Sequence, residues 1–257
     1  MGGNELKDKN PPLVVSLGGS VLFSVEDVTD ASQVVENIRG VCEVLARAAE
    51  EKRVGVVVGG GPFARIYIGF GRKMGMGEKK LDEIGITFTR LNARLVIRCF
   101  QEMGLGVPEV VPETVETAAR LLKNHRLVVM GGTVPGHTTD AVSAMLAREV
   151  GAVFLVNVTN VDGIYTADPR KDPGAKRLDF VSFDRLVSMT SSAEGIAGAN
   201  VVVDPVAARI IKEASIPMVV VNGKDRAALE RALRGDFSVG TLVAARPRGS
   251  PGSPGPP

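Results

Sequence analysis

Short apolar runs rich in valine alternate along this chain with longer stretches in which apolar residues recur every three or four positions. The short runs are apolar on both faces, a pattern typical of strands in a parallel sheet that is covered on both sides. The runs that predict strands are residues 13–17, 54–58, 107–111, 127–130, 153–158 and 217–221.

The longer stretches have the spacing of amphipathic helices. Between residues 31 and 50, for example, Val34, Ile38, Val41 and Leu45 form one apolar stripe. The stretches that predict helices are residues 31–50, 62–73, 78–103, 113–123, 139–150, 205–214 and 226–233. This alternation predicts an α/β fold, a three-layer α/β/α sandwich with a mostly parallel central sheet, and places ligands at the carboxyl ends of the strands.

The alternation breaks between residues 162 and 200. Asp168-Pro169 and Asp172-Pro173 disrupt both helix and strand there, and loops of this length are usually binding loops or lids, or else disordered. Residues 246–257 are rich in proline and glycine, which predicts a disordered tail. We expect one continuous domain at 13–245, between an N-terminal extension at 1–12 and this tail.

Composition narrows the classes of ligand. Lysine plus arginine number 31 against 29 aspartates plus glutamates, aromatic residues make up 4%, and tryptophan is absent. A nearly neutral chain with few stacking platforms does not favour nucleic acid, so small ligands are expected. Cys42 and Cys99 fall within apolar helical patterns and stand at no metal-ligand spacing from His125 or His137, so no protein metal site is predicted.

The sequence also bears on location. Its apolar runs are shorter than a bilayer span, and the polar first residues differ from a signal peptide. We expect a cytoplasmic protein without a membrane partner.

Three of the predicted strands end in glycine-rich turns. Gly18-Gly19-Ser20 follows the first strand, residues 59–61 (Gly-Gly-Gly) follow the second, and residues 131–140 lead from another strand into a helix. Glycine lets the backbone approach a bound group, and the free N–H groups of a first helical turn attract phosphate. Such turns at one edge predict a cleft that holds a polyanion, or two phosphorylated molecules that meet head to head.

Each candidate residue in these turns also has a purely structural interpretation. A glycine pair can be an ordinary turn, Arg65 can lie on a solvated helix face, and Asp140 can complement a helix dipole. If Asp140 instead lies near a transferred phosphate, magnesium or a cationic side chain must lie between them. Asp162 and Asp168 precede glycine and proline, which is typical of turns.

Known nucleotide motifs do not decide between these interpretations. The chain contains neither the Walker pattern GxxxxGK[ST] nor GxGxxG followed by an acid at the expected distance. Any nucleotide is therefore bound by a different scheme.

Residues 18–22, 56–61, 131–140 and 159–169 together resemble a known family. The last of these segments reads Thr-Asn-Val-Asp-Gly-Ile-Tyr-Thr-Ala-Asp-Pro. From about residue 13 to about residue 243 the chain is similar to the amino acid kinase superfamily, and most closely to its archaeal-type UMP kinases. The segments at 131–140 and 159–169 are the specific ones, because the first two are shared across the superfamily.

The resemblance implies phosphorylation of UMP to UDP with ATP and Mg²⁺, with UMP on the amino-terminal half and ATP on the carboxyl-terminal half. Asp140 and Arg65 would be catalytic. UMP would be bound by Gly60, Asp82, Thr133, Val134, Pro135, Gly136, His137, Thr138 and Thr139. ATP would be bound by Gly19, Ser20, Gly61, Arg65, Thr159, Tyr165 and Asp168. A homohexamer built from dimers is also implied, with the long helix at 78–103 as a candidate subunit contact.

One departure from the superfamily pattern keeps alternatives open. Many members carry a lysine two residues before the glycine pair, where this chain has Ser16. Magnesium, Arg65 and backbone N–H groups would then have to carry more of the charge, with Arg209 as a further candidate. The alternatives are a superfamily kinase for isopentenyl phosphate or an amino acid, and a non-catalytic protein that binds a nucleotide or an oxyanion.

Overall fold

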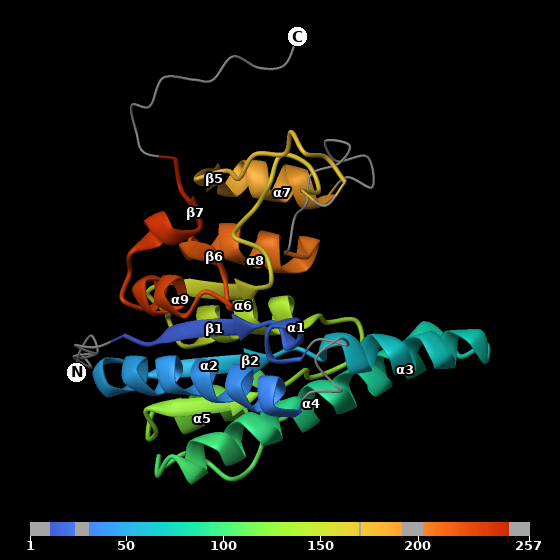
Figure 1. Ribbon diagram of the computed structural model, residues 1–257, viewed down its shortest axis with the longest axis vertical. Coiled ribbons are helices and arrows are strands. Elements are labelled where there is room, and N and C mark those ends of the chain that lie inside the picture. The colour runs from blue at the N-terminus through green and yellow to red at the C-terminus, as the bar shows by residue number, and fades with distance from the viewer. Residues whose placement is uncertain (1–10, 24–30, 170, 192–202, 247–257) are drawn as a thin grey trace, which may run out of the picture.

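The structure is a computed structural model that describes residues 11–23, 31–169, 171–191 and 203–246. Within these residues a seven-stranded sheet has the order β3-β2-β1-β4-β6-β7-β5 (Figure 1). The strands are β1 (Leu13–Leu17), β2 (Val54–Val58), β3 (Leu127–Met130), β4 (Leu155–Thr159), β5 (Phe180–Ser182), β6 (Met218–Asn222) and β7 (Thr241–Ala244). Every strand pair is parallel except β6 with β7. The predicted α/β fold with a mostly parallel sheet is confirmed.

Helices cover both faces of this sheet. They are α1 (Gly19–Leu22), α2 (Ala31–Glu51), α3 (Gly61–Lys73), α4 (Glu78–Glu102), α5 (Val115–Leu122), α6 (Thr139–Glu149), α7 (Phe183–Ser191), α8 (Pro205–Ala214) and α9 (Arg226–Leu233), with a short 3₁₀ turn, η2 (Phe237–Val239). Helices α2, α4 and α9 pack on one face, and α5 to α8 pack on the other. Figure 1 looks onto the face that carries α2.

Alternation along each strand divides the core between the two faces. In β1, Leu13, Val15 and Leu17 pack with α2, α4 and α9, whereas Val14 packs with α5 and α6. All five residues of β1 are buried, as they are in β2. Strands that bury both faces explain the valine-rich runs in the sequence.

The strand predicted at 107–111 was wrong. Val107 is buried, but Pro108 cannot donate a hydrogen bond to a neighbouring strand, and Val110 is 66% exposed. Residues 107–111 run as a loop from α4 toward α5, and β3 forms the edge of the sheet.

The long segment predicted to be irregular is more ordered than expected. Residues 180–191 form β5 and α7, and β7, which was not predicted, pairs with both β5 and β6. Residues 163–169 and 171–179 run mostly without helix or strand, as the prolines indicated. Residues 170 and 192–200, the proline-rich tail at 247–257 and most of the amino-terminal extension lie outside the described residues.

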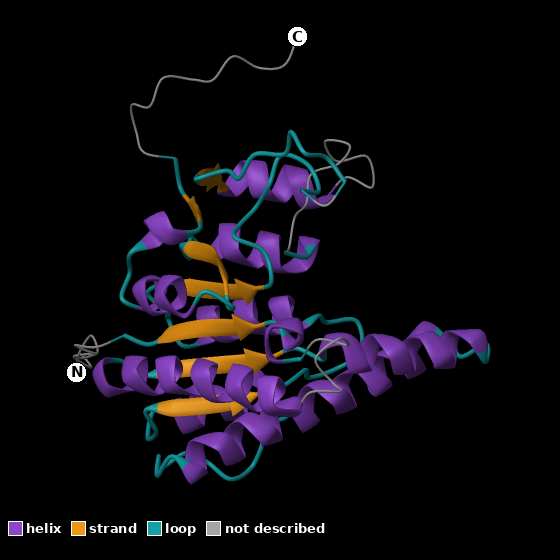
Figure 2. Cartoon of the chain, in the orientation of Figure 1, coloured by secondary structure: helices purple, strands orange, loops and turns teal. Residues whose placement is uncertain are grey.

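The topology brings five strand ends to one edge. Strands β1, β2, β3, β4 and β6 are mutually parallel, and the strand arrows in Figure 2 show this shared edge. The chain proceeds from β1 through β2 to β3 on one side and then returns to place β4 on the other side of β1. Ligands of open α/β sheets bind at such a switch point, outside the carboxyl ends of the strands.

Candidate active site

The turns after β1 and β2 pack directly against each other. A Cβ atom on Gly19 would lie 2.5 Å from the carbonyl oxygen of Gly59 and 2.7 Å from the Cα of Gly61. Gly61 also has a φ of 68°, which disfavours any residue with a side chain. The glycines at 59–61 were predicted to let the backbone approach a bound group. In the structure, part of that space is filled by the glycine turn after β1.

Helix α4 holds the glycine turns from the side. The Nδ2 of Asn92 donates to the carbonyl oxygens of Gly59 and Gly60, at 2.8 and 3.1 Å. The hydroxyl of Thr89 accepts a hydrogen bond of 2.7 Å from the Gly132 N–H. Both side chains are buried, so these bonds fix the backbone of two turns relative to one helix.

Arg90 extends this support to the segment after β3. Its guanidinium donates to the carbonyl oxygens of Gly132 and Thr133, at 3.1 and 3.0 Å, and forms an ion pair of 2.9 Å with Glu113. Sequence reasoning missed Arg90 together with Thr89 and Asn92. A usable signal was present, because polar residues at 89 and 92 interrupt the apolar stripe of a predicted helix.

Asp82, also on α4, supports the tip of the same segment. Its Oδ2 accepts a hydrogen bond of 2.7 Å from the Gly136 N–H, and Gly136 has a φ of 88°. The N–H of His137 turns back to the carbonyl oxygen of Val134, at 3.3 Å. Within the described residues the Oδ1 of Asp82 has no hydrogen-bond partner. The carboxylate therefore supports the loop and keeps one oxygen for a ligand.

Asp140 lies in the first turn of α6, against the end of β1. The Ser16 hydroxyl donates a hydrogen bond of 2.8 Å to its Oδ1. Burial raises the pKa of Asp140 to about 6; the Ser16 hydrogen bond opposes this shift and the nearby charge of Asp204 adds to it. The position that carries lysine in many superfamily members thus contacts Asp140 through a neutral hydroxyl.

The first turns of α6 and α8 are joined. Thr138 caps α6 by accepting from the Ala141 N–H, and Asp204 caps α8 by accepting from the Val206 and Ala207 N–H groups. The Thr138 hydroxyl also donates to the Oδ2 of Asp204, at 2.5 Å. This bond spans 66 residues of sequence and links the segment after β3 to the carboxyl-terminal half of the chain. Asp204 was not predicted as a site residue.

On the other side of β1, the turn after β4 is tied to the end of β6. The Nδ2 of Asn222 donates to the Oδ1 of Asp162 at 2.8 Å, and the Tyr165 hydroxyl contacts the Oδ2 at 3.4 Å. Asp162 is therefore engaged in holding its own turn. The carbonyl oxygen of Asp168 accepts from two N–H groups in the following residues, so Asp168 starts a turn, as its place before proline indicated.

The arginine and histidine side chains considered for the site are not buried. Arg65 is exposed in the second turn of α3 and makes no hydrogen bond or ion pair with the part of the chain that the structure describes. Arg209 is exposed in α8, and His137 is half-buried in the loop after β3. A guanidinium without a protein partner, such as that of Arg65, can bind an anionic ligand.

Most of the predicted residues are brought together. The residues at or just after the carboxyl ends of β1 to β4 are Gly19, Ser20, Gly60, Gly61, Thr133–Thr139, Asp140 and Thr159. Asp82 joins them through its hydrogen bond to Gly136. Tyr165 lies further out, where its backbone bridges to Arg177. The arrangement offers backbone N–H groups, a buried carboxylate and a guanidinium that has no partner among the described residues, which suits two anionic ligands.

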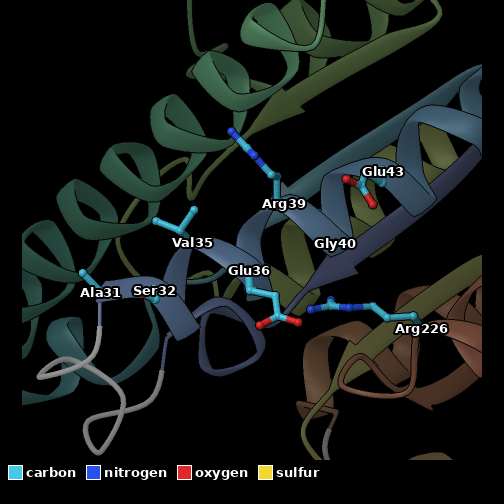
Figure 3. A pocket seen from close by; sticks show the side chains of 8 residues that line it. All are labelled: Ala31, Ser32, Val35, Glu36, Arg39, Gly40, Glu43 and Arg226. Carbon is cyan, nitrogen blue, oxygen red and sulfur yellow. The ribbon is translucent and has the colours of Figure 1, made fainter.

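A cavity of about 680 Å³ lies on the flank, between α2 and α9. Figure 3 shows Glu36 of α2 and Arg226 of α9 facing one another there, and Arg39 and Glu43 also lie on α2. The two acids offset the two guanidinium groups, so this cavity has no net charge with which to attract phosphate. We do not place a substrate in it.

The described residues show neither a protein-only metal site nor a membrane-spanning helix. They contain no cluster of three or more histidine, cysteine, aspartate or glutamate side chains that could hold a metal ion. None of their helices is both long enough and apolar enough to cross a membrane.

Comparison with known proteins gives one consistent result. Residues 11–222 match the model of the amino acid kinase family. The chain is 44% identical over 235 residues to a protein named uridylate kinase from Methanoculleus marisnigri, covering 90% of this chain and 94% of that one.

Solved structures agree with the sequence matches. The crystal structure of uridylate kinase from Archaeoglobus fulgidus is 41% identical, has a TM-score of 0.77, and aligns over 91% of this chain and all of that one. The crystal structure of UMP kinase from Bacillus anthracis, at 22% identity and a TM-score of 0.75, covers 91% of this chain and 96% of its own and shares the fold.

Proposed function

This chain belongs to the amino acid kinase family, and from that premise we propose that it transfers the terminal phosphoryl group of ATP to the phosphate of UMP, giving UDP and ADP. The single observation that carries the proposal is its match, over about nine-tenths of its length, to proteins named uridylate kinase at more than 40% identity. The arrangement of the strand-end turns supports it, because they can hold two phosphorylated ligands at one switch point.

We assign the acceptor to the segment after β3. Residues 133–139, held by Asp82 and Arg90, would surround the UMP phosphate, and Gly60 would form the adjoining wall. The unpartnered Oδ1 of Asp82 is suited to accept a hydrogen bond from a ribose hydroxyl. This role combines the predicted ribose contact with the loop support seen in the structure.

We assign the donor to the turns around β1 and β4. Gly19, Ser20 and Gly61 would offer backbone N–H groups to the ATP phosphates, and the unpaired guanidinium of Arg65 would bind phosphate oxygens. Thr159, Tyr165 and Asp168 would line the remainder of the ATP site. The donor and acceptor phosphates would then meet above the end of β1.

The chemistry requires charge stabilisation more than proton removal. The phosphate oxygen of UMP is already anionic near pH 7, so the attack on ATP needs no strong general base. A new bond forms between that oxygen and the terminal phosphorus, while the bond to the ADP oxygen breaks. Arg65 and the strand-end N–H groups stabilise the charge that develops on the transferred phosphoryl group.

The residues present are compatible with magnesium. The buried carboxyl of Asp140 accepts one hydrogen bond, from Ser16, and its other oxygen lacks a partner among the described residues. Magnesium in phosphoryl-transfer sites is commonly held by one or two carboxylates together with substrate phosphates, which a lone Asp140 can satisfy. When bound with ATP, the ion supplies positive charge beside the phosphate oxygens.

We also propose that the enzyme is a homohexamer built from dimers. Apolar side chains on α3 and α4 are unusually exposed: Tyr67 by 53%, Phe70 by 51%, Leu91 by 57% and Leu95 by 44%. Exposed apolar clusters of this kind mark protein contacts, and the α3–α4 pair extends away from the sheet (Figure 1). Light scattering on the wild type and on Leu95→Glu tests this assembly. Cytoplasmic location stays a prediction.

A panel of phosphate acceptors tests the function. Purified protein is mixed with ATP and magnesium, and ADP release is followed with UMP, CMP, isopentenyl phosphate, N-acetylglutamate and carbamate. We expect turnover with UMP, weaker turnover with CMP and none with the others. Turnover with isopentenyl phosphate or an amino acid alone would contradict the proposal.

Two variants distinguish a catalytic role of this chain from a role in nucleotide binding alone. Asp140→Asn should bind both nucleotides and lose about a hundredfold in turnover, ~3 kcal/mol of barrier. Glu149→Gln, an exposed acid at the other end of α6, should keep the wild-type rate. Equal, negligible rates in all three proteins would favour a nucleotide-binding role.

A further inference from the structure

Two turns lie on either side of β4 and are bound to successive residues of it. The Gly18 N–H donates to the carbonyl oxygen of Val158 at 2.9 Å, and the Gly223 N–H donates to that of Thr159 at 2.8 Å. The first turn follows β1 and the second follows β6, so they are separated by two strand spacings, about 10 Å. Thr159, assigned above to the ATP site, lies between them.

The turn after β6 is packed against the turn after β1. A Cβ atom on Gly223 would clash with Val21, in the short helix that begins at Gly19, and would lie 2.6 Å from the Cγ1 of Val158. The residue after Gly223 is Lys224. Gly223 packs so closely against Val21 that no side chain fits at position 223. This packing holds the backbone of the next residue, Lys224, close to the turn after β1.

Hydrogen bonds fix the backbone of this lysine. The side-chain oxygen of Asn222 accepts from the Lys224 N–H at 2.9 Å, while its Nδ2 donates to Asp162. The guanidinium of Arg226 donates to the Gly223 carbonyl oxygen at 3.4 Å. The turn is held at three points before α9 begins.

The side chain of Lys224, in contrast, is uncommitted. It is exposed and makes no hydrogen bond or ion pair within the described parts of the chain. A lysine can extend about 6 Å from its Cα, more than half of the distance between the two turns. The Lys224 ammonium can therefore reach the space above Thr159.

The negative charges at this edge exceed the positive charges assigned to it so far. Ser16 supplies a neutral hydroxyl to Asp140, and the acids Asp140, Asp162 and Asp204 all lie near the same strand ends. The ATP phosphates would add further negative charge. Arg65 approaches from the β2 side, so the β6 side has no assigned positive charge.

We propose that Lys224 binds the polyphosphate chain of the donor nucleotide and supplies positive charge that Ser16 does not. The inference rests on the proposed function, because it takes ATP as the donor. Lys224 is then a substrate-binding residue placed by a glycine turn, and its ammonium donates hydrogen bonds to phosphate oxygens between the turns after β1 and β6.

Equilibrium binding of ATP, with magnesium, tests the proposal by calorimetry. Lys224→Met should weaken ATP binding at least tenfold, whereas Lys224→Arg should stay within a few-fold of the wild type. Adenosine, measured by competition, should bind all three proteins alike because it carries no phosphate. Lys123→Met removes the same charge at the end of α5, near Arg53 and the amino end of β2, and should bind ATP like the wild type.

The possible results are distinguishable. Unchanged ATP affinity in Lys224→Met would overturn the inference and leave the proposed function standing. Equal weakening of ATP and adenosine would also overturn it, since the phosphates would then not be the contact. A wild-type protein that binds no ATP would remove the proposed function and this inference with it. Thermal unfolding should not change in Lys224→Met, because the side chain has no partner in the part of the chain that the structure describes.

Discussion

Ser16 and Asp140 are joined by a hydrogen bond of 2.8 Å between side chains that lie 124 residues apart. The bond connects the end of β1 with the first turn of α6. It gives the buried carboxyl of Asp140 a neutral partner and no salt bridge, and burial raises its pKa to about 6. A site that keeps a carboxylate without a compensating cation is prepared for a ligand that brings positive charge.

The first prediction concerns stability against pH. Folding raises the pKa of Asp140 from 3.8 to about 6, so the folded protein binds this proton more tightly than the unfolded chain does. The stabilising effect is present at low pH and is lost as the pH rises from about 4 to about 6, by up to about 3 kcal/mol. Without ligands, Asp140→Asn should therefore be more stable than the wild type at pH 7.5, and this gain should shrink toward pH 4.

Urea denaturation across this pH range measures the difference. The asparagine can still accept the Ser16 hydrogen bond, so the comparison isolates the charge. Glu149→Gln removes an exposed carboxylate from the same helix and should change stability by less than about 0.5 kcal/mol at any of these pH values. A pH-independent difference for Asp140→Asn would contradict the account.

The second prediction concerns the contact between glycine turns. Gly19→Ala would push a methyl group into the backbone of residues 59 and 61, which cannot move aside, and should cost at least about 1–3 kcal/mol. ATP affinity should fall with it. Gly69→Ala, in α3, places its methyl group in open space and should stabilise the helix by about 0.5–1 kcal/mol. Thermal unfolding of both variants gives the test; equal effects would count against close turn packing.

The third prediction separates the two roles of Asp82. Asp82→Asn keeps an acceptor for the Gly136 N–H, while Asp82→Ala removes it and should raise the Michaelis constant for UMP about tenfold or more. If Asp82 also binds ribose, the wild type should prefer UMP to 2′-deoxy-UMP, and Asp82→Asn should narrow that preference. Initial rates with both acceptors give the answer. A preference unchanged in Asp82→Asn would limit Asp82 to supporting the loop.

A fourth prediction concerns the bond between helix caps. Asp204→Ala should lose about 1 kcal/mol from the α8 cap, and it also releases the hydroxyl of Thr138. Combined with Thr138→Val in a double-mutant cycle of unfolding free energies, the pair should show a coupling of about 0.5–3 kcal/mol. Thr138→Ser, which keeps a hydroxyl, should restore most of the stability. Additive effects would mean that the caps are independent.

Much of the fold could be predicted because strands that are buried on both faces consist mainly of apolar residues. The runs that became β1 to β4 and β6 are mostly apolar, and the helix at 78–103 was located within one residue of α4. Residues 107–111 contain three valines, which misled the prediction although Pro108 and Glu109 disfavour a strand. β5, with three residues, is too short for a periodic pattern to reveal.

The site residues that are glycines or aspartates in the turns after strands could be predicted. The residues that hold these turns from distant parts of the sequence could not. Gly19 and Gly61 were singled out, but their contact with each other depends on strand order. Asn92 and Asp204 act through bonds to residues 33 and 66 positions away, which no local pattern records. The turn that carries Lys224 reaches the same end of the sheet as Gly18 only because β4 pairs with both β1 and β6.

The central claim is that strand-end backbone gathers the phosphates of two nucleotides at one switch point, with Asp140 beneath them. A crystal structure with UMP, magnesium and a non-hydrolysable ATP analogue tests it most directly. The account predicts the UMP phosphate against residues 133–139 and the ATP phosphates over Gly19, Ser20 and Gly61. Density for both nucleotides that leaves the loop around Pro135 and His137 empty would contradict it.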